Sequence, residues 1–160
     1  MTASWSVADT KARLFESARK DRIIRDLASR DLRRSVIGLV EQRVTQVELA
    51  KELRMSQPAV SQLVARARRE TPVADGFSGA SPFEICQRYA AGLIDRGRLV
   101  DELIRWDYAE VLPLVPGDDL VSEVPGSVQE VEDAYFQGLI GDSEYQDVYA
   151  GWEVLSNSRG

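Results

Sequence analysis

Amide, hydroxyl and short apolar side chains recur at helical spacing between residues 57 and 65. Gln57 and Gln62 each offer a paired donor and acceptor that matches the edge of adenine, and the Ser61 hydroxyl can bond either class of base edge. Pro58 and Ala65 add small apolar surfaces of the kind that touch a thymine methyl group. The pattern predicts that these five residues contact bases in the major groove of DNA.

Cationic side chains surround these five positions and suit contacts with DNA phosphates. Phosphate contacts supply most of the affinity of a DNA-binding protein, whereas base contacts supply its specificity. The candidates are Arg43, Lys51, Arg54, Arg66, Arg68 and Arg69. A solvated helix face is the alternative interpretation, and for the three arginines after residue 65 the two weigh equally.

Two short helices joined by a turn would position these groups. Leu49 and Leu53 supply the inner face of the first helix. The inner face of the second helix consists of Val60, Leu63 and Val64. Ser56 is placed to cap the second helix, and Pro58 falls in its first turn, where a missing N–H costs nothing. At 100° per residue, the face opposite Val60 then carries Pro58, Ser61, Gln62 and Ala65, with Gln57 at the exposed N-terminal end of the helix.

Residues 45–64 resemble the helix-turn-helix motif of lambda-type phage repressors and their bacterial relatives. The shared pattern is Gln-x-x-Leu-Ala followed by Ser-Gln-x-x-Val-x-x-Leu. The resemblance implies sequence-specific DNA binding in which Gln46 caps the first helix and contacts a phosphate. It also implies that Gln57 and Gln62 contact bases.

The chain departs from that family in two places. Arg54 stands where the family usually has Gly, and an αL backbone would carry a steric cost for Arg, so we expect a differently shaped turn. The family also tends to end its second helix early, whereas residues 64–70 continue the helical pattern here.

Charge divides the chain into two halves. The 160 residues carry a formal net charge of −6, which as an average is unfavourable for DNA binding. Residues 1–70, however, contain 15 Lys and Arg against 9 Asp and Glu, whereas residues 71–160 contain 5 against 17. The basic surface is therefore expected in the first half, and the second half is expected to avoid DNA.

Composition argues against catalysis. With no His, a single Cys and no Gly-rich phosphate loop, most acid–base, nucleophilic and metal sites lack their residues. We therefore expect no enzyme activity, no cofactor and no metal site. The sequence also lacks an apolar stretch of membrane-spanning length and a signal peptide, which predicts a cytoplasmic protein.

The helical patterning predicts an all-α fold with two domains. Residues 1–70 form the DNA-binding domain, in which a long helix begins near Ser6 and residues 31–43 form a supporting helix. Residues 71–80, rich in Gly, Pro and Ser, are expected to be a linker, and residues 81–160 an acidic helical domain. The side chains of the supporting helix expected to face inward are Leu32, Val36, Leu39 and Val40.

The acidic half contains an internal repeat, in which residues 81–106 match residues 127–152 with an offset of 46. Eight of 26 positions are identical. Each copy is predicted to be a helical hairpin whose first helix ends at Gly92 or Gly138, where Gly favours the αL conformation of a helix stop. The shared residues are Ser81, Glu84, Tyr89, Gly92, Leu93, Ile94, Asp101 and Trp106, with Ser127, Glu130, Tyr135, Gly138, Leu139, Ile140, Asp147 and Trp152.

The repeat makes predictions for single residues. Ser127 and Glu130 are expected to form a capping box at the start of a helix, as are their counterparts in the first copy. Cys86 corresponds to Glu132, which would hardly be buried without a partner, so Cys86 is expected near the surface. The acidic segment between the copies, residues 109–126, is expected to be a solvated connection.

Together these features predict a DNA-binding transcriptional regulator, with repression the favoured action. A homodimer on a palindromic operator is expected, because two-fold symmetry brings two recognition helices to grooves one turn apart. The acidic residues 81–160 would serve assembly or bind a cationic protein such as a toxin, as in autoregulating antitoxins. The alternative is a protein-interaction module that uses the helix-turn-helix for docking rather than for DNA.

Overall fold

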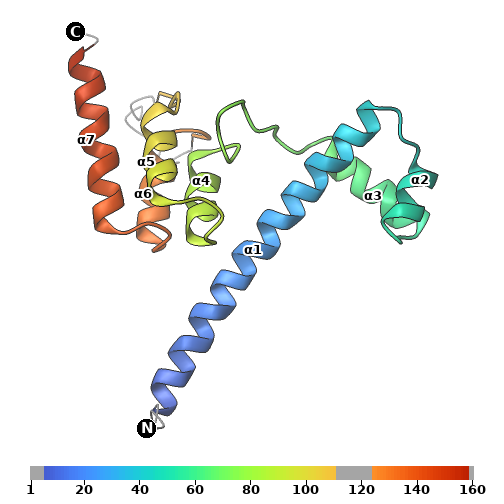
Figure 1. Cartoon of the computed structure of the whole chain (residues 1–160), viewed down its shortest axis with the longest axis horizontal. Coiled ribbons are helices and arrows are strands. Elements are labelled where there is room, and N and C mark those ends of the chain that lie inside the picture. Colours follow the sequence, from blue (N-terminus) through green and yellow to red (C-terminus); the bar gives the residue numbers. More distant parts are fainter. Residues whose placement is uncertain (1–5, 111–123, 159–160) are drawn as a thin grey trace, which may run out of the picture. The chain divides into compact units, whose positions relative to one another are not determined.

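The computed structural model describes residues 6–110 and 124–158, and the regular elements within those ranges are all α-helices (Figure 1). The expected all-α class is therefore confirmed for the described residues. No helix among them is long and apolar enough to cross a lipid bilayer. The helices are α1 (Val7–Glu41), α2 (Gln46–Glu52), α3 (Gln57–Ala67), α4 (Pro82–Ala90), α5 (Arg96–Arg105), α6 (Gln129–Phe136) and α7 (Asp142–Ser158).

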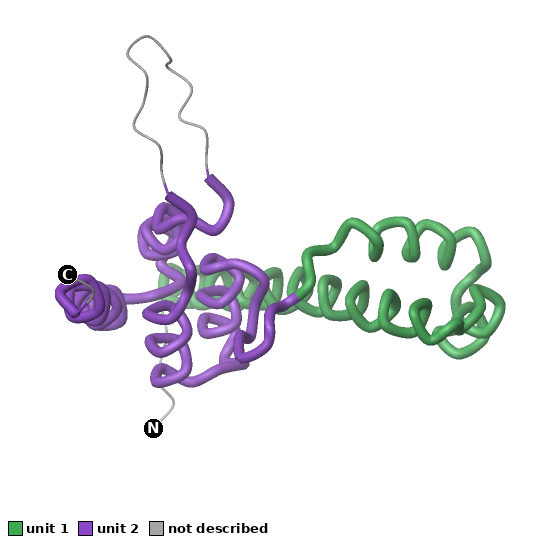
Figure 2. The backbone as a smooth tube through the Cα atoms, turned by 90° about the horizontal axis from the view of Figure 1, so that it is seen from above, with its two compact units in different colours: residues 1–72 green, residues 73–160 purple. Residues whose placement is uncertain are grey.

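The chain divides into two compact units, residues 1–72 and residues 73–160 (Figure 2). The boundary falls inside the segment 71–80 that was expected to be a linker. Of the connection expected at residues 109–126, residues 111–123 lie outside the described residues.

Part of the expected linker is held firmly within the second unit. The Glu102 carboxylate accepts hydrogen bonds from the backbone N–H and the hydroxyl of Ser78 at 2.8 and 2.7 Å. The ring of Phe77 packs edge-on against Trp106 with a centroid distance of 5.0 Å. Residues 77–80 are therefore a packed strap on α5 rather than a free tether.

A single 35-residue helix, α1, runs through both the expected N-terminal helix and the expected supporting helix. It begins with a capping box, in which the Ser6 side chain accepts from the Asp9 N–H and the Asp9 carboxylate accepts from the Ser6 N–H. Gln42 ends it, and the next residue, Arg43, has a positive φ of 66°.

The last part of α1 packs into the core cluster that it shares with α2 and α3. Val36 is buried, and Ile37 and Val40 pack against it from the same helix. Leu32 and Leu39 were expected to face inward, but they are 40% and 38% exposed. At 100° per residue, Leu32 and Leu39 lie about 40° and 60° from Val36, on the side away from Ile37 and Val40, so they border the buried face instead of entering it.

The core of the first unit is small and joins all three of its helices. Its buried members are Val36, Leu49, Val60, Val64 and Ala67. The turn between α2 and α3 adds Met55, which packs against this cluster as a flexible side chain in a tight turn should. Five buried aliphatic residues thus fix α2 and α3 onto the end of α1.

In the second unit, residues that are 46 positions apart occupy matching places. Gly92 and Gly138 have φ values of 77° and 74°, as the helix stop requires. The N–H of the residue after each Gly donates to the equivalent carbonyl in the two copies. Leu93 donates to the Arg88 carbonyl at 2.8 Å, and Leu139 donates to the Ala134 carbonyl at 2.9 Å. Helix α4 packs on α5 and α6, and α7 packs on α5 and α6.

Three predictions drawn from this repeat are wrong. Ser81 caps α4 by accepting from the Glu84 N–H, but it forms no capping box with Glu84, whose carboxylate accepts from the Ala80 N–H instead. Cys86 is completely buried rather than near the surface, because the copies differ at this position: its counterpart Glu132 is partly exposed and accepts from the Tyr149 hydroxyl. Ser127 forms no capping box with Glu130, because the Glu130 carboxylate is occupied by the backbone N–H groups of Gly126 and Phe83.

Aromatic rings form a continuous run along α6 and α7. Tyr135 stacks on Tyr145 at 4.7 Å between ring centroids, Tyr145 contacts Tyr149 at 4.9 Å, and Tyr149 contacts Trp152 at 4.9 Å. Trp152 then meets Tyr108 at 5.0 Å. The run links α7 to the residues that follow α5.

Candidate nucleic-acid interface

Helix α3 presents one face to the core and the other to solvent. The Ser56 side chain caps it by accepting from the Ala59 N–H at 3.3 Å, and Pro58 lies in its first turn, both as expected. Val60, Val64 and Ala67 are buried on the inner side. The five residues predicted to contact bases are all exposed, and we refer to them as the α3 face: Gln57, Pro58, Ser61, Gln62 and Ala65.

The α3 face has no carboxylate of its own, because α3 contains no acidic residue. On the neighbouring helix α2, the first turn contains one acidic residue, Glu48. Its carboxylate is bound by the Thr45 N–H at 2.8 Å and the Thr45 hydroxyl at 2.9 Å, and these hydrogen bonds lower the pKa of Glu48. Helix capping therefore engages this negative charge.

All seven residues predicted to contact phosphates are exposed. Arg66 lies in the last turn of α3. The helix was expected to continue to Glu70 but ends at Ala67, so Arg68 and Arg69 lie beyond it. The others lie around α2, and the full set is Arg43, Gln46, Lys51, Arg54, Arg66, Arg68 and Arg69.

Gln46 is not the cap of α2. Thr45 caps it with a capping box that includes Glu48, and Gln46 is the first helical residue. A cap residue adopts extended backbone and offers a short side-chain oxygen to the first turn, which Thr does and Gln does less well. The Gln46 side chain is therefore left exposed at the N-terminus of α2.

Arginines in the left-handed backbone region flank α2 at both ends. Arg43 precedes the helix with φ 66°, and Arg54 follows it with φ 52°. The expectation of a differently shaped turn is wrong at Arg54, since the chain takes the αL conformation without a Gly. Side chains that adopt this conformation cost about 1–2 kcal/mol, so the core that anchors α2 must offset that strain.

An ion-pair clamp that the sequence did not reveal holds the end of α3 against α1. Glu70 accepts from Arg33 Nε at 2.5 Å and lies 3.5 Å from Arg34 Nη2. Arg34 Nε also donates to the Thr71 carbonyl at 3.1 Å. The sequence offered one signal for this clamp: Glu70 is a single carboxylate directly after an arginine-rich segment, which is a place where a Glu in an ion pair is expected.

The second unit offers an open hollow between the end of α5 and α7, lined by Trp106, Tyr108 and Trp152 among others. Two of its polar side chains are engaged within the fold, since the Leu103 carbonyl accepts from the Tyr108 hydroxyl at 2.6 Å and from Trp152 Nε1 at 3.1 Å, whereas Trp106 Nε1 is buried without a hydrogen-bond partner among the described residues. Arg105 is likewise bound by Asp101 and by the Gly76 carbonyl. The hollow is therefore a weaker candidate than the α3 face.

Among the described residues, no group of three or more His, Cys, Asp and Glu side chains could hold a metal ion. Comparison of the chain with protein-family models, with curated proteins and with solved structures gives no match.

Proposed function

We propose that this protein is a transcriptional regulator that binds a specific DNA sequence through the α3 face, and that it acts in the cytoplasm as a repressor. The observation that carries the proposal is the sidedness of α3: Val60, Val64 and Ala67 are buried, and all five candidate base-contacting residues are exposed. Helix-turn-helix proteins insert such a helix into the major groove.

The electrostatics of the first unit support this proposal. The seven exposed candidates for phosphate contact lie in or beside α2 and at the C-terminal end of α3, and six of them are cationic. In a docked complex they would flank the α3 face, where phosphates border the groove. Residues 71–160 carry the opposite charge, 17 acidic against 5 basic residues, and would stay away from DNA.

The test is selection from a random duplex pool with the full chain, repeated at two salt concentrations. We expect enrichment of one sequence and an affinity that falls steeply with salt. Retention of no sequence would overturn the proposal and favour a docking role for α2 and α3.

Two alanine variants then locate the contacts on the selected sequence. Gln57→Ala and Gln62→Ala should each cost about 1–3 kcal/mol of binding free energy on that sequence. The matched control is Gln146→Ala, an exposed Gln in α7, which should bind as the parent does. Unchanged affinity for both test variants would show that α3 does not read bases.

The second unit suits a different task, because its charge favours a cationic protein partner. Within the proposed regulator it would act as an antitoxin-like module that covers a nucleic-acid-binding surface of a toxin. Coexpression of the full chain with the product of a neighbouring gene tests this role. The expected result is a complex that dissociates at high salt. If the product of the neighbouring gene neither copurifies with the chain nor loses its toxicity, the antitoxin-like role is contradicted.

A further inference from the structure

One face of α1 is exposed along the whole helix, and its residues follow the spacing of a coiled-coil seam. Starting at Val7, the positions advance by four and three residues in alternation until Leu39, which is the a/d pattern of a heptad. Every one of them is exposed. We call this set the α1 stripe: Val7, Lys11, Leu14, Ala18, Asp21, Arg25, Ala28, Leu32, Ser35 and Leu39.

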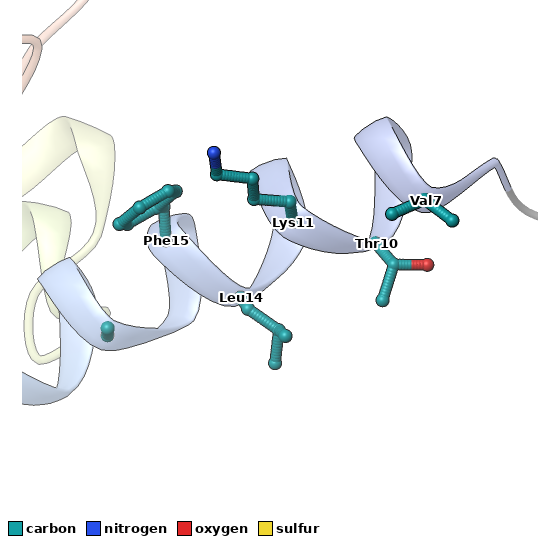
Figure 3. Close-up of a pocket in the computed structure, with 6 residues that line it drawn as sticks. Val7, Thr10, Lys11, Leu14 and Phe15 are labelled. Carbon is teal, nitrogen blue, oxygen red and sulfur yellow. The ribbon is translucent and has the colours of Figure 1, made fainter.

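Large apolar side chains occupy both ends of the α1 stripe. Val7 and Leu14 are 88% and 66% exposed, and Leu32 and Leu39 are 40% and 38% exposed. Figure 3 shows the N-terminal part, where an open apolar hollow is lined by α1 residues alone, with Lys11 and Phe15 on one border and Leu14 on the other. Large apolar side chains that are exposed together on one face of a helix mark an interaction site.

We propose that a second copy of this chain covers the α1 stripe, so that the two α1 helices form an antiparallel coiled coil centred on Ile23. In this register every position of one heptad class faces one of the other class, as antiparallel packing requires. Leu14 faces the partner's Leu32, and Val7 faces the partner's Leu39. Each pair occurs twice because the interface is two-fold symmetric.

Charge complementarity fixes the direction of pairing. Within the α1 stripe, the two charged residues nearest the centre of the pairing are Asp21 and Arg25. In the antiparallel register Asp21 faces the partner's Arg25. A parallel pair would instead bring Asp21 onto its own copy and Arg25 onto its own copy, and like charges in facing positions are unfavourable. A polar layer inside an apolar seam is a known way to specify register.

The remaining layers also suit this register. Ala18 faces the partner's Ala28, so small side chains lie on both sides of the charged layers and let the helices approach closely. Ile24, which is 38% exposed, borders the seam beside the two-fold axis and would meet its own copy. The pairing uses no residue of α2 or α3.

The pairing has a consequence that rests on the proposed function. Val36 anchors α1 to α3, and the partner's Val36 would lie level with Thr10, 26 residues away along the helix. At 1.5 Å per residue the two attachment points are about 39 Å apart. Successive major grooves on one side of DNA are separated by roughly 34–36 Å, so the antiparallel pair would match a palindromic site.

Cysteine crosslinking of the full chain without DNA tests the pairing and its direction. The native Cys86 is buried, so introduced thiols react alone. With a short bifunctional thiol reagent, Leu14→Cys mixed with Leu32→Cys should give covalent dimers. Leu14→Cys alone should not, because Leu14 and the partner's Leu14 would be about 27 Å apart. Leu93→Cys, an exposed control in the second unit, should give no covalent dimer.

Each other outcome overturns the proposal. Dimers from Leu14→Cys alone would indicate parallel pairing, and no dimer in the mixture would indicate that the α1 stripe is not a self-association surface. Circular dichroism verifies that each variant is still helical. Because the assay contains no DNA, its failure is distinguishable from failure of base recognition, which the duplex selection measures separately.

A charge exchange gives an independent readout. Asp21→Arg should raise the dimer dissociation constant by roughly tenfold or more, measured by analytical ultracentrifugation, because Arg would then face the partner's Arg25. Asp21→Arg combined with Arg25→Asp should restore dimerisation, since opposite charges face each other again. A combined variant as weak as the single one would overturn the register.

Discussion

Glu84 and Glu130, which are 46 positions apart, make the same backbone contact. The carboxylate of Glu84 accepts from the N–H of Ala80 at 3.1 Å, and that of Glu130 accepts from the N–H of Gly126 at 2.8 Å. In each hairpin an acid therefore binds the chain four residues before it and fixes the entry to the first helix. The second contacts differ, since Glu84 pairs with Arg88 at 2.9 Å and Glu130 reaches Phe83 in the other hairpin.

We expect Glu84→Gln to lower the free energy of unfolding of the second unit by about 3 kcal/mol, because it breaks the buried ion pair between Glu84 and Arg88. Urea unfolding followed by near-ultraviolet circular dichroism measures this change. Glu153→Gln, at an exposed site in α7, is the control and should stay within about 0.5 kcal/mol of the parent. Equal stability of the two variants would contradict a structural role for Glu84.

Gly151 lets α7 approach α5 closely. The effect of Gly151→Ala on stability should therefore change sign when the side chain that it meets on α5 is removed. A Cβ at this position would lie 2.6 Å from Ile104 Cγ1 and still nearer to Cδ1. Overpacking of this kind costs about 1–3 kcal/mol, which outweighs the gain of roughly 1 kcal/mol from Ala over Gly in a helix. Gly151→Ala should therefore destabilise the parent but stabilise an Ile104→Ala variant, as thermal unfolding of the four proteins would reveal. The same sign in both backgrounds would contradict the close approach.

Arg54 offers a test of backbone strain beside the proposed interface. Because its φ is 52°, Arg54→Gly should raise the stability of the first unit by about 0.5–1 kcal/mol, once the greater freedom of Gly in the unfolded chain is subtracted. Lys51→Gly, one turn earlier within α2, should lower that stability by about 1 kcal/mol. Amide hydrogen exchange in α2 and α3 measures both, and loss of protection in Arg54→Gly would exclude relief of strain.

Cys86 should be chemically inert in the folded protein. Burial, and secondarily the negative charge of Glu130, raises the pKa of the thiol to about 12, so the reactive thiolate is scarce near neutral pH. We expect an alkylating reagent to modify Cys86 only at the rate at which the second unit opens, and to modify it quickly in urea. Rapid modification without denaturant would mean that this core is open in solution.

The two kinds of proposed DNA contact should separate by their salt dependence. Arg66→Ala should weaken binding to all sequences and reduce the slope of log affinity against log salt by about 1, because one phosphate contact is lost. Gln62→Ala should keep the slope and lose discrimination at one base pair. Lys20→Ala, on the exposed N-terminal part of α1, is the control and should change neither.

Local signals in the sequence were sufficient for much of the architecture. The caps at Ser6 and Ser56 and the glycine stops at Gly92 and Gly138 are set by contacts within a few residues, so the sequence predicts them directly. The exposed positions of the α3 face follow from helical geometry and the placement of Val60.

Features that depend on distant packing could not be predicted in the same way. Burial of Cys86 depends on how α4 meets α5 and α6, and the two copies of the repeat do not share that environment. The Glu130 carboxylate binds the Phe83 N–H, a contact 47 residues away in the sequence, and not the Ser127 N–H that a capping box would use. The exposure of Leu32 and Leu39 follows from the side of α1 that α3 covers, and inferring it requires the packed structure.

The run of rings from Tyr135 to Trp152 gives the protein a built-in optical reporter. Tyrosines at centroid distances of 4.7–4.9 Å pass excitation energy along the run, and the indole of Trp152 is its final acceptor. Light absorbed on α6 is therefore emitted largely by a tryptophan on α7. Separation of these two helices would return emission to Tyr135 alone, because Tyr145 and Tyr149 lie on α7 with Trp152, so the closure of this hairpin can be followed without any added dye.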